Sequence, residues 1–440
     1  MANPSASKTD KTMENATIDI ETLVLDIARD AREASLQLAN EPTEKKNKAI
    51  LRLAALLSDN ADLLKEENAK DLAAAEENGL TKAMIKRLQL DDKRLNSMIE
   101  GAQQVAALPD PVGASLDSYQ HRQGFTIEKV RVPIGVIGII YESRPNVTVD
   151  CAILCLKSGN ASILRGGKEA FHTNIALAKL VTQSLQDAGL PEKASQFIPT
   201  KDRAALNTLL KLDDKVQCII PRGGESLIRF VAENSTIPVI KHYDGICTLY
   251  VDKDADASLA ESIVINSKTQ YPSVCNAVEN LLVHNDLIDT LLPQIAKSLK
   301  EKEVELRADE RSLAALQKAG VAAKPATEED WGTEYLDLIL SIKTVDDFKE
   351  AMSFINHYGS SHSDGILTAN TQTAEAFLNG IDSATVYWNV STRFTDGFEF
   401  GLGAEIGIST DKLHARGPMG LNELCSYKYK VVGNGQIKQS

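Results

Sequence analysis

The chain has 440 residues, of which 43% are hydrophobic, and its formal net charge at pH 7 is −13. This length exceeds what one hydrophobic core usually organises, so we expect two domains with extensions. The acidic balance excludes nucleic acid and anionic membrane surfaces as main partners, because both require a basic protein face.

The N-terminal part of the chain is expected to be helical after a polar start. Residues 1–17 are polar and lack periodicity, which predicts a flexible tail. In residues 18–113 apolar side chains recur three or four positions apart, as in Leu23, Ile27 and Ala31. This spacing predicts a layer of amphipathic helices laid on a later sheet.

The rest of the chain predicts an α/β architecture. Residues 114–132 alternate between apolar and polar side chains, which indicates a β-hairpin. From Pro133 onward short apolar strands alternate with helical runs, which is typical of parallel strands in a doubly wound sheet. We therefore predict one domain from residues 18–113 and 133–254, a second from residues 255–415, and a C-terminal segment, residues 416–440. The expected strands are residues 135–141, 161–164, 195–198, 216–220, 246–251, 278–283, 304–307, 336–342, 365–369 and 385–389.

Cys275 lies between a helical run that ends near Lys268 and the strand that follows. Pro272 ends the helix because it lacks a backbone donor, and Ser273 and Asn276 favour a turn. The thiol is thus expected on a loop held at both ends, between the two domains, where such folds bind ligands. This position favours a nucleophile. A packing role stays open, because a free cysteine usually acts as a small hydrophobe.

The other cysteines and the apolar runs set further limits. The chain has no CxxC pair and no metal-type histidine spacing, so we expect reduced thiols and no metal site. It shows no apolar run long enough to span a membrane and no signal-peptide core, so we expect a soluble, cytoplasmic protein. Five cysteines lie in apolar runs or in the tail and are interpreted as packing: Cys151, Cys155, Cys218, Cys247 and Cys425.

Two predicted strands end in glycine pairs, Gly166 with Gly167 and Gly223 with Gly224. Glycine lets a ligand approach the backbone, and the N-terminus of a following helix favours phosphate, so a dinucleotide is the natural ligand. An ordinary strand-to-helix turn remains the alternative for either pair alone. The segment GLGAEIG, residues 401–407, fails as a dinucleotide fingerprint because isoleucine holds its sixth place.

Six long motifs carry a resemblance that covers roughly residues 20–438. They are VPIGVIGIIYESRPNVTVD, LRGGKEA, PRGGESLI, IPVIKHYDGIC, YPSVCNAVENLLVH and GLGAEIGISTDKLHARGPMGL. With them the chain resembles the γ-glutamyl phosphate reductases, or glutamate-5-semialdehyde dehydrogenases, a family of the aldehyde dehydrogenase superfamily. The resemblance implies two doubly wound α/β domains, first a Rossmann-like NADP-binding domain and then a catalytic domain. It also implies a β oligomerisation arm built from residues 114–132 and 416–440.

The implied activity is the NADPH-dependent reduction of L-glutamyl 5-phosphate to L-glutamate 5-semialdehyde and phosphate, in proline biosynthesis. Cys275 is similar to the superfamily nucleophile that forms a thioester. Asn146 stands where an asparagine amide completes the oxyanion hole, although the residues alone favour a cap for the helix that begins at Val147, and both roles could hold at once. In one respect the chain departs from its hydrolytic relatives, because His242 occupies the place of their base glutamate.

The resemblance also implies binding residues. Arg165 stands where many relatives have a lysine that contacts the adenosine ribose, Gly224 stands near the pyrophosphate, and Glu334 resembles a glutamate that holds the nicotinamide ribose. Gly166, Gly167 and Gly223 of the two glycine pairs complete the cofactor-binding candidates. The substrate carries a phosphoryl group and an α-carboxylate, which favours guanidinium partners. The substrate-binding candidates are Arg144, Arg393 and Arg416, for each of which an ordinary ion pair is the alternative, and His414 is a possible proton donor.

Partners and alternatives complete the predictions. Unpaired strand edges in the arm predict a homodimer or higher homo-oligomer, and the unstable substrate suggests docking on glutamate 5-kinase. Two other functions stay open: a dehydrogenase that forms a free acid or a coenzyme A ester, and a dinucleotide-binding scaffold without activity. The missing base glutamate disfavours the free acid. The joint presence of Cys275, Asn146 and Glu334 disfavours the scaffold.

Overall fold

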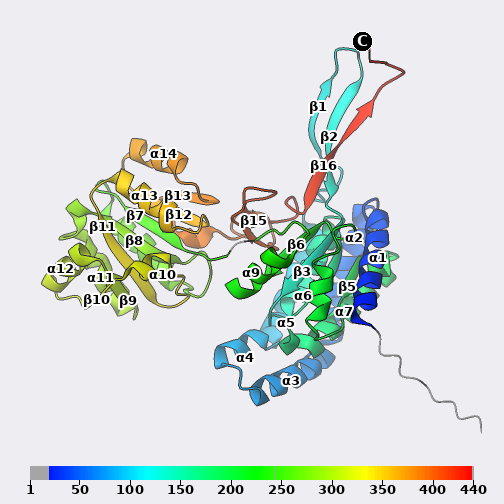
Figure 1. Cartoon of the computed structure of the whole chain (residues 1–440), viewed down its shortest axis with the longest axis horizontal. Coiled ribbons are helices and arrows are strands. Elements are labelled where there is room, and N and C mark those ends of the chain that lie inside the picture. Colours follow the sequence, from blue (N-terminus) through cyan, green and yellow to red (C-terminus); the bar gives the residue numbers. More distant parts are fainter. Residues whose placement is uncertain (1–18, 242, 439–440) are drawn as a thin grey trace, which may run out of the picture.

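The computed structural model describes residues 19–241 and 243–438. Two α/β units lie side by side, and a narrow β arm projects from the first of them (Figure 1). The predicted tail, residues 1–17, lies outside the described residues, as does His242. No helix in the described ranges is long and apolar enough to cross a membrane.

The first unit is built on a four-stranded parallel sheet with the order β5-β4-β3-β6. Its central strand β3 is buried on both faces. Ile137, Ile139 and Tyr141 point into one core, and Val136 and Ile140 point into the other. This explains its continuous apolar sequence, because helices cover both faces of such a sheet. The strands are β3 (Val136–Tyr141), β4 (Ala161–Arg165), β5 (Ser195–Phe197) and β6 (Cys218–Arg222).

Helices cover this sheet on both sides, so the predicted helical layer is divided between them. Helices α1 and α8 pack in one core, and α2, α5, α6 and α7 pack in the other. Their bounds are α1 (Ile20–Leu38), α2 (Thr43–Asp59), α3 (Ala61–Glu77), α4 (Lys82–Leu88), α5 (Asp92–Ala107), α6 (Asn146–Lys157), α7 (Phe171–Ala188), α8 (Ala204–Leu209) and α9 (Glu225–Asn234).

The second unit holds a seven-stranded parallel sheet with the order β10-β9-β11-β8-β7-β12-β13. Helices α10, α11 and α12 cover one face, and α13 and α14 cover the other. The strands are β7 (Cys247–Val251), β8 (Val278–His284), β9 (Glu305–Ala308), β10 (Lys324–Pro325), β11 (Ile339–Val345), β12 (Ser363–Leu367) and β13 (Thr385–Trp388). The helices are α10 (Ala257–Thr269), α11 (Leu291–Glu301), α12 (Glu310–Lys318), α13 (Phe348–Tyr358) and α14 (Thr371–Gly380).

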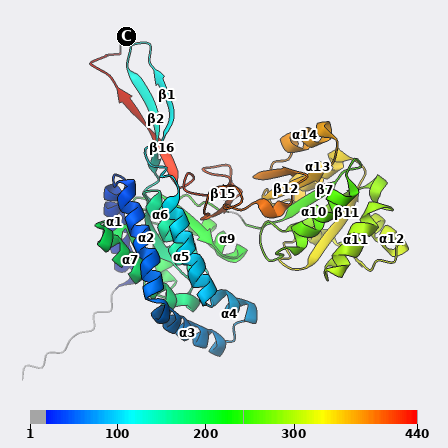
Figure 2. The ribbon, with the colours of Figure 1, turned by 180° about the vertical axis from the view of Figure 1, so that it is seen from behind.

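The arm is a three-stranded antiparallel sheet with the order β1-β2-β16. It stands clear of both units when seen from front and back (Figures 1 and 2). Its strands are β1 (Ser115–Gln120), β2 (Thr126–Pro133) and β16 (Cys425–Val432). The chain also contains the short ribbon β14 (Gly407–Ser409) with β15 (Gly417–Met419), and the 3₁₀ turns η1 (Lys168–Ala170), η2 (Glu192–Ala194), η3 (Asn285–Leu287), η4 (Glu328–Gly332) and η5 (Thr392–Phe394).

The unit boundaries differ from the predicted ones in two places. The sequence predicts strand β7 in the first domain, within residues 133–254, but the strand pairs with β8 and β12 in the second sheet. It predicts residues 404–415 in the second domain, but Ala404 and Ile406 pack in the core of the first. Alternation of strands and helices predicts the elements, but it does not tell which sheet a strand joins. Pairing between distant segments decides that.

Candidate active site

Cys275 lies in the loop between α10 and β8, as the sequence predicts. Its side chain is partly exposed, whereas the other five cysteines are buried. The loop is held by backbone and side-chain bonds: the Asn276 amide donates to the Thr395 carbonyl (2.8 Å), and the Cys247 thiol lies 3.2 Å from the Cys275 carbonyl oxygen. A Cβ at Gly245 would lie 2.0 Å from that same oxygen, so only glycine fits there. Cys275 is therefore the thiol that a ligand can reach.

Burial, together with nearby carboxylates, keeps the Cys275 thiol protonated at neutral pH. Burial raises the pKa of Cys275 to about 12; the carboxylates of Glu405 and Glu334 add to the rise, and the guanidinium of Arg222 opposes it. Because the thiolate is the nucleophile, reactivity depends on how far bound ligands shift this balance. Glu405 belongs to the GLGAEIG segment, which supplies a charge beside the cysteine although it is not a dinucleotide fingerprint.

We expect alkylation of Cys275 by iodoacetamide to rise about tenfold per pH unit between pH 7 and 10, because the thiolate fraction rises by that factor below the pKa. Glu405→Gln removes a nearby negative charge and lowers the pKa of Cys275, so it should speed alkylation at pH 8. Mass spectrometry of the Cys275 peptide measures both rates. Glu399→Gln, which removes an exposed carboxylate two residues before that segment, is the matched control. A rate that is flat across this pH range contradicts the expectation.

Asn146 is the first residue of α6, and its side chain does not cap the helix. Its Nδ2 donates instead to Oδ2 of Asp150, one turn later, at 2.9 Å. Asn146 and Asp150 line a cavity of about 300 Å³ together with Ser273 and Val274 of the cysteine loop. The capping alternative is thus wrong, and the amide lies beside the loop of the proposed nucleophile.

The two glycine pairs meet at one edge of the first sheet. A Cβ added at Gly167 would lie 3.3 Å from the backbone nitrogen of Ser143. A Cβ added at Gly223 would lie 2.6 Å from Cδ of Glu142. Both pairs therefore flank the segment that follows β3, at the carboxyl ends of β3, β4 and β6. Gly224 precedes the ten-residue helix α9, which has no side-chain cap. Free backbone N–H groups at this edge fit a phosphate.

Arg165 is the last residue of β4 at this edge, and Glu334 lies near enough to Cys275 for its carboxylate to raise the pKa of the thiol. Nε of Arg165 is buried and has no hydrogen-bond partner within the described part of the chain, while its Nη1 donates to the Gly166 carbonyl at 3.0 Å. Oε1 of Glu334 accepts from the Gly245 nitrogen at 2.9 Å. The orphaned guanidinium nitrogen and the uncapped helix make this donor set suitable for a dinucleotide phosphate.

A buried ion pair holds the Glu334 and Cys275 loops together. Nζ of Lys268 lies 2.6 Å from Oε2 of Glu279, and both side chains are fully buried. The other carboxylate oxygen, Oε1, accepts from the Leu336 nitrogen at 3.3 Å. The pair thus joins the end of α10, the start of β8 and the Glu334 loop.

The arginine and histidine candidates are placed differently from one another. Arg144 lines the 300 Å³ cavity. Nε of Arg393 donates to Gln270 at 2.9 Å. Burial lowers the pKa of Arg393, and the Cys275 charge opposes this change. Arg416 forms the ordinary ion pair that the sequence left open, with Asp382 at 2.8 Å. His414 contacts the Glu423 carbonyl through Nε2 at 2.7 Å.

Sequence reasoning missed several residues that lie at the site. Arg87 and Arg94, from the helical segment, line the same cavity as Arg144. Arg222 is the last residue of the strand β6, directly before Gly223, so the glycine motif itself contained a signal for it. Asp150 lies four residues after Asn146, the spacing that places two side chains on one helix face. Within the described ranges no group of three or more metal-ligating side chains gathers.

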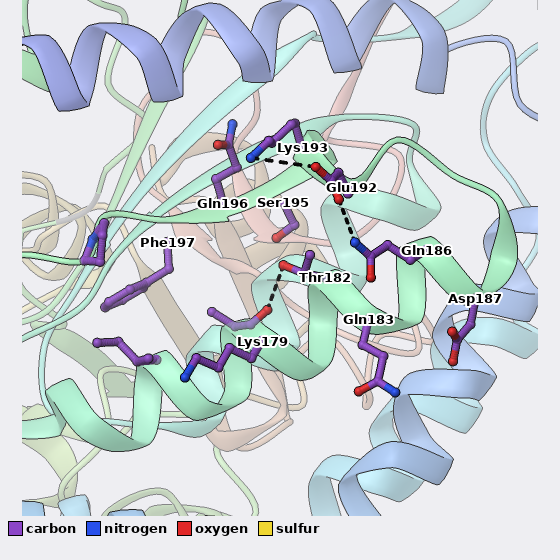
Figure 3. A pocket seen from close by; sticks show the side chains of 13 residues that line it. Lys179, Thr182, Gln183, Gln186, Asp187, Glu192, Lys193, Ser195, Gln196 and Phe197 are labelled. Carbon is purple, nitrogen blue, oxygen red and sulfur yellow. Dashed lines mark hydrogen bonds and ion pairs between the residues drawn. The ribbon is translucent and has the colours of Figure 1, made fainter.

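A larger cavity, of about 640 Å³, lies between α7 and the edge strand β5 (Figure 3). Its lining is mixed in charge: Gln186 donates to Glu192 at 2.6 Å, and Lys193 lies 3.9 Å from the same carboxylate. None of the predicted site residues lines it. The smaller cavity beside the cysteine loop is therefore the better candidate for a substrate.

Comparisons with known proteins identify the family of the chain. The model of the aldehyde dehydrogenase family matches residues 2–320. The chain is 57% identical to a γ-glutamyl phosphate reductase from Opitutus terrae, covering 96% of this chain and 99% of that one. The crystal structure of γ-glutamyl phosphate reductase from Thermotoga maritima superposes with a TM-score of 0.92 at 45% identity, covering 94% of this chain and 100% of that one. An acetylating aldehyde dehydrogenase from Geobacillus thermoglucosidasius shares the fold, with a TM-score of 0.67 at 15% identity, covering 96% of this chain and 98% of that one.

Proposed function

Because the chain belongs to the aldehyde dehydrogenase family, we propose that it reduces L-glutamyl 5-phosphate to L-glutamate 5-semialdehyde and phosphate with NADPH, a step of proline biosynthesis. The observation that carries the proposal is the cavity that combines Asn146, Arg144 and the Cys275 loop, in a chain 57% identical to a γ-glutamyl phosphate reductase.

The residues of the chain have separate roles in this reaction. The Cys275 thiolate attacks the acyl phosphate carbonyl, the bond to phosphate breaks, and a thioester forms on Sγ. A bound reduced nicotinamide supplies the hydride that reduces this thioester. The resulting thiohemiacetal on Cys275 collapses to the aldehyde and releases the thiolate. In both tetrahedral states the oxygen carries negative charge, which the second N–H of the Asn146 amide would stabilise.

The cofactor would lie along the glycine edge of the first unit. Gly166, Gly167, Gly223 and Gly224 would bring backbone N–H groups to its phosphates, and Glu334 would hold the nicotinamide ribose. The preference for NADP(H) rests on Arg165, whose orphaned Nε suits a 2′-phosphate. Equal kcat/KM with NADPH and NADH would contradict that preference.

The arm and the thiols support two further parts of the proposal. Tyr427, Tyr429, Val431 and Val432 of β16 are exposed in a lone chain, which favours a homodimer or larger homo-oligomer with residues 114–132 and 416–440 as its oligomerisation arm. A monomer mass in solution at micromolar concentration would contradict it.

All six cysteines are free, which suits the cytoplasm, where docking on glutamate 5-kinase would protect the acyl phosphate.

The deciding experiment runs the reaction backward. Glutamate 5-semialdehyde and NADP should yield NADPH only when phosphate or arsenate is present. Release of the acyl group as a free acid needs a general base to activate water, and this chain has His242 in place of the base glutamate. The rate of NADPH formation is measured without phosphate, with phosphate, and with sulfate at equal ionic strength as the control. Sustained phosphate-independent turnover to glutamate would mean a hydrolytic dehydrogenase.

A further inference from the structure

The 300 Å³ cavity is lined by segments from three parts of the chain. Arg87 and Arg94 come from the α4–α5 region, Arg144, Asn146 and Asp150 come from the start of α6, and Tyr271, Ser273 and Val274 come from the cysteine loop. The last group places one end of the cavity beside the proposed nucleophile. The other groups bring several charges to it.

The three arginines of this cavity have no carboxylate partner within ion-pair distance in the described part of the chain. Elsewhere arginines form such pairs, as Arg307 does with Asp330 at 2.6 Å. Nη1 of Arg94 is held by the carbonyls of Arg87 (2.9 Å) and Gln89, which fixes the guanidinium at the cavity wall. Three guanidinium groups gathered without a carboxylate partner among the described residues indicate an anionic ligand.

Asp150 is the one carboxylate among the residues that line the cavity. Its Oδ2 accepts from Asn146, while its Oδ1 has no hydrogen-bond partner among the residues that the structure describes. Burial raises the pKa of this carboxyl to about 6, with the Asn146 bond and the Arg222 charge opposing the rise. It is thus an acceptor with one free oxygen in a site that otherwise carries positive charge.

These charges match the amino acid end of the proposed substrate. L-glutamyl 5-phosphate carries an α-carboxylate and an α-ammonium, separated from the reacting carbonyl by a short aliphatic chain. We propose that Arg87 and Arg94 bind the α-carboxylate and that Asp150 binds the α-ammonium, so that these three residues select an α-amino acid. This inference rests on the proposed function and names the residues that define its substrate class.

The lining of the cavity supports this assignment. Arg144 lies two residues before Asn146, the proposed oxyanion donor, whereas Arg87 and Arg94 come from the separate α4–α5 region. After burial, the charges of Arg222 and Arg87 lower the pKa of Arg144, so these guanidinium groups act on one another at one site.

The test compares three aldehydes in the oxidative assay with NADP and phosphate. They are glutamate 5-semialdehyde, 5-oxopentanoate, which lacks the amine, and 4-aminobutanal, which lacks the carboxylate. Asp150→Asn keeps an oxygen that can accept the Asn146 amide, and Arg94→Ala removes one guanidinium. The control variants are Glu100→Gln and Lys93→Ala, which remove exposed charges of the same signs from α5.

Asp150→Asn should lower kcat/KM about tenfold to hundredfold for the two amines, the effect of one charge-assisted hydrogen bond, and change 5-oxopentanoate less than about twofold. Arg94→Ala should instead affect the two carboxylates and spare 4-aminobutanal. Each result is the ratio of the variant kcat/KM to the wild-type kcat/KM on the same substrate. Cyclisation lowers the concentration of free aminoaldehyde equally in both assays, so it does not change this ratio. For an analogue that turns over too slowly, its inhibition constant against glutamate 5-semialdehyde replaces kcat/KM.

An equal loss on all three aldehydes would overturn the proposal, because it would mean a merely structural role for these residues. In that case wild-type turnover of glutamate 5-semialdehyde would leave the proposed function intact. If the wild type turned over none of the three aldehydes, the proposed function would fall, and the assignment of these three residues with it.

Discussion

Cys275→Ala is expected to abolish reduction of L-glutamyl 5-phosphate while leaving the protein folded. The covalent step has no substitute in the site, and loss of the nucleophile in enzymes of this type costs a factor of about 10⁴ or more in kcat. The side chain is partly exposed, and the loop is held by the Cys275 carbonyl and the Asn276 amide, which the substitution retains. Little packing is therefore lost.

The measurement combines phosphate-dependent NADPH formation with a thermal unfolding midpoint for each variant. Cys425→Ala, which removes a buried thiol at the base of the arm, is the control and should retain activity. Cys275→Ser should resemble the alanine variant, because a hydroxyl is a much weaker nucleophile. Residual activity above a few per cent in Cys275→Ala would refute the covalent mechanism.

Asn146→Ala is expected to lower kcat by a factor of about 10²–10³, the usual effect of removing one oxyanion-hole donor. The change in KM should be small, because the amide acts mainly on the charge that develops in the tetrahedral states. The substitution should also cost less stability than the loss of a helix cap, about 1 kcal/mol, since Asn146 does not cap α6.

Steady-state kinetics and urea denaturation of the same preparation separate the two roles of Asn146. Asn96→Ala, on the exposed face of α5, is the matched control for loss of an amide. If Asn146→Ala lost about 1 kcal/mol of stability, as the loss of a helix cap does, but kept its kcat, Asn146 would have a structural role only.

Local spacing is enough to locate the loop of the proposed nucleophile and the elements around it. A helical period that stops before Pro272, two turn formers and a following apolar strand predict a loop thiol at Cys275, and the structure has that loop between α10 and β8. The glycine pairs likewise end β4 and β6, as predicted. These features depend on neighbours a few residues apart, and sequence spacing records them directly. The six motifs added the family.

Only the tertiary structure decided which distant segments meet. The apolar sequence of strand β7 would suit either sheet, so only its pairing with β8 decides that it joins the second one. Arg87 and Arg94 resemble solvated charges of surface helices in the sequence, yet packing of α4 and α5 near α6 brings them to the cavity of Asn146. The same holds for Glu405, which affects the pKa of Cys275 from a segment far along the chain. Charge at this site is set by long-range packing, which residue spacing does not encode.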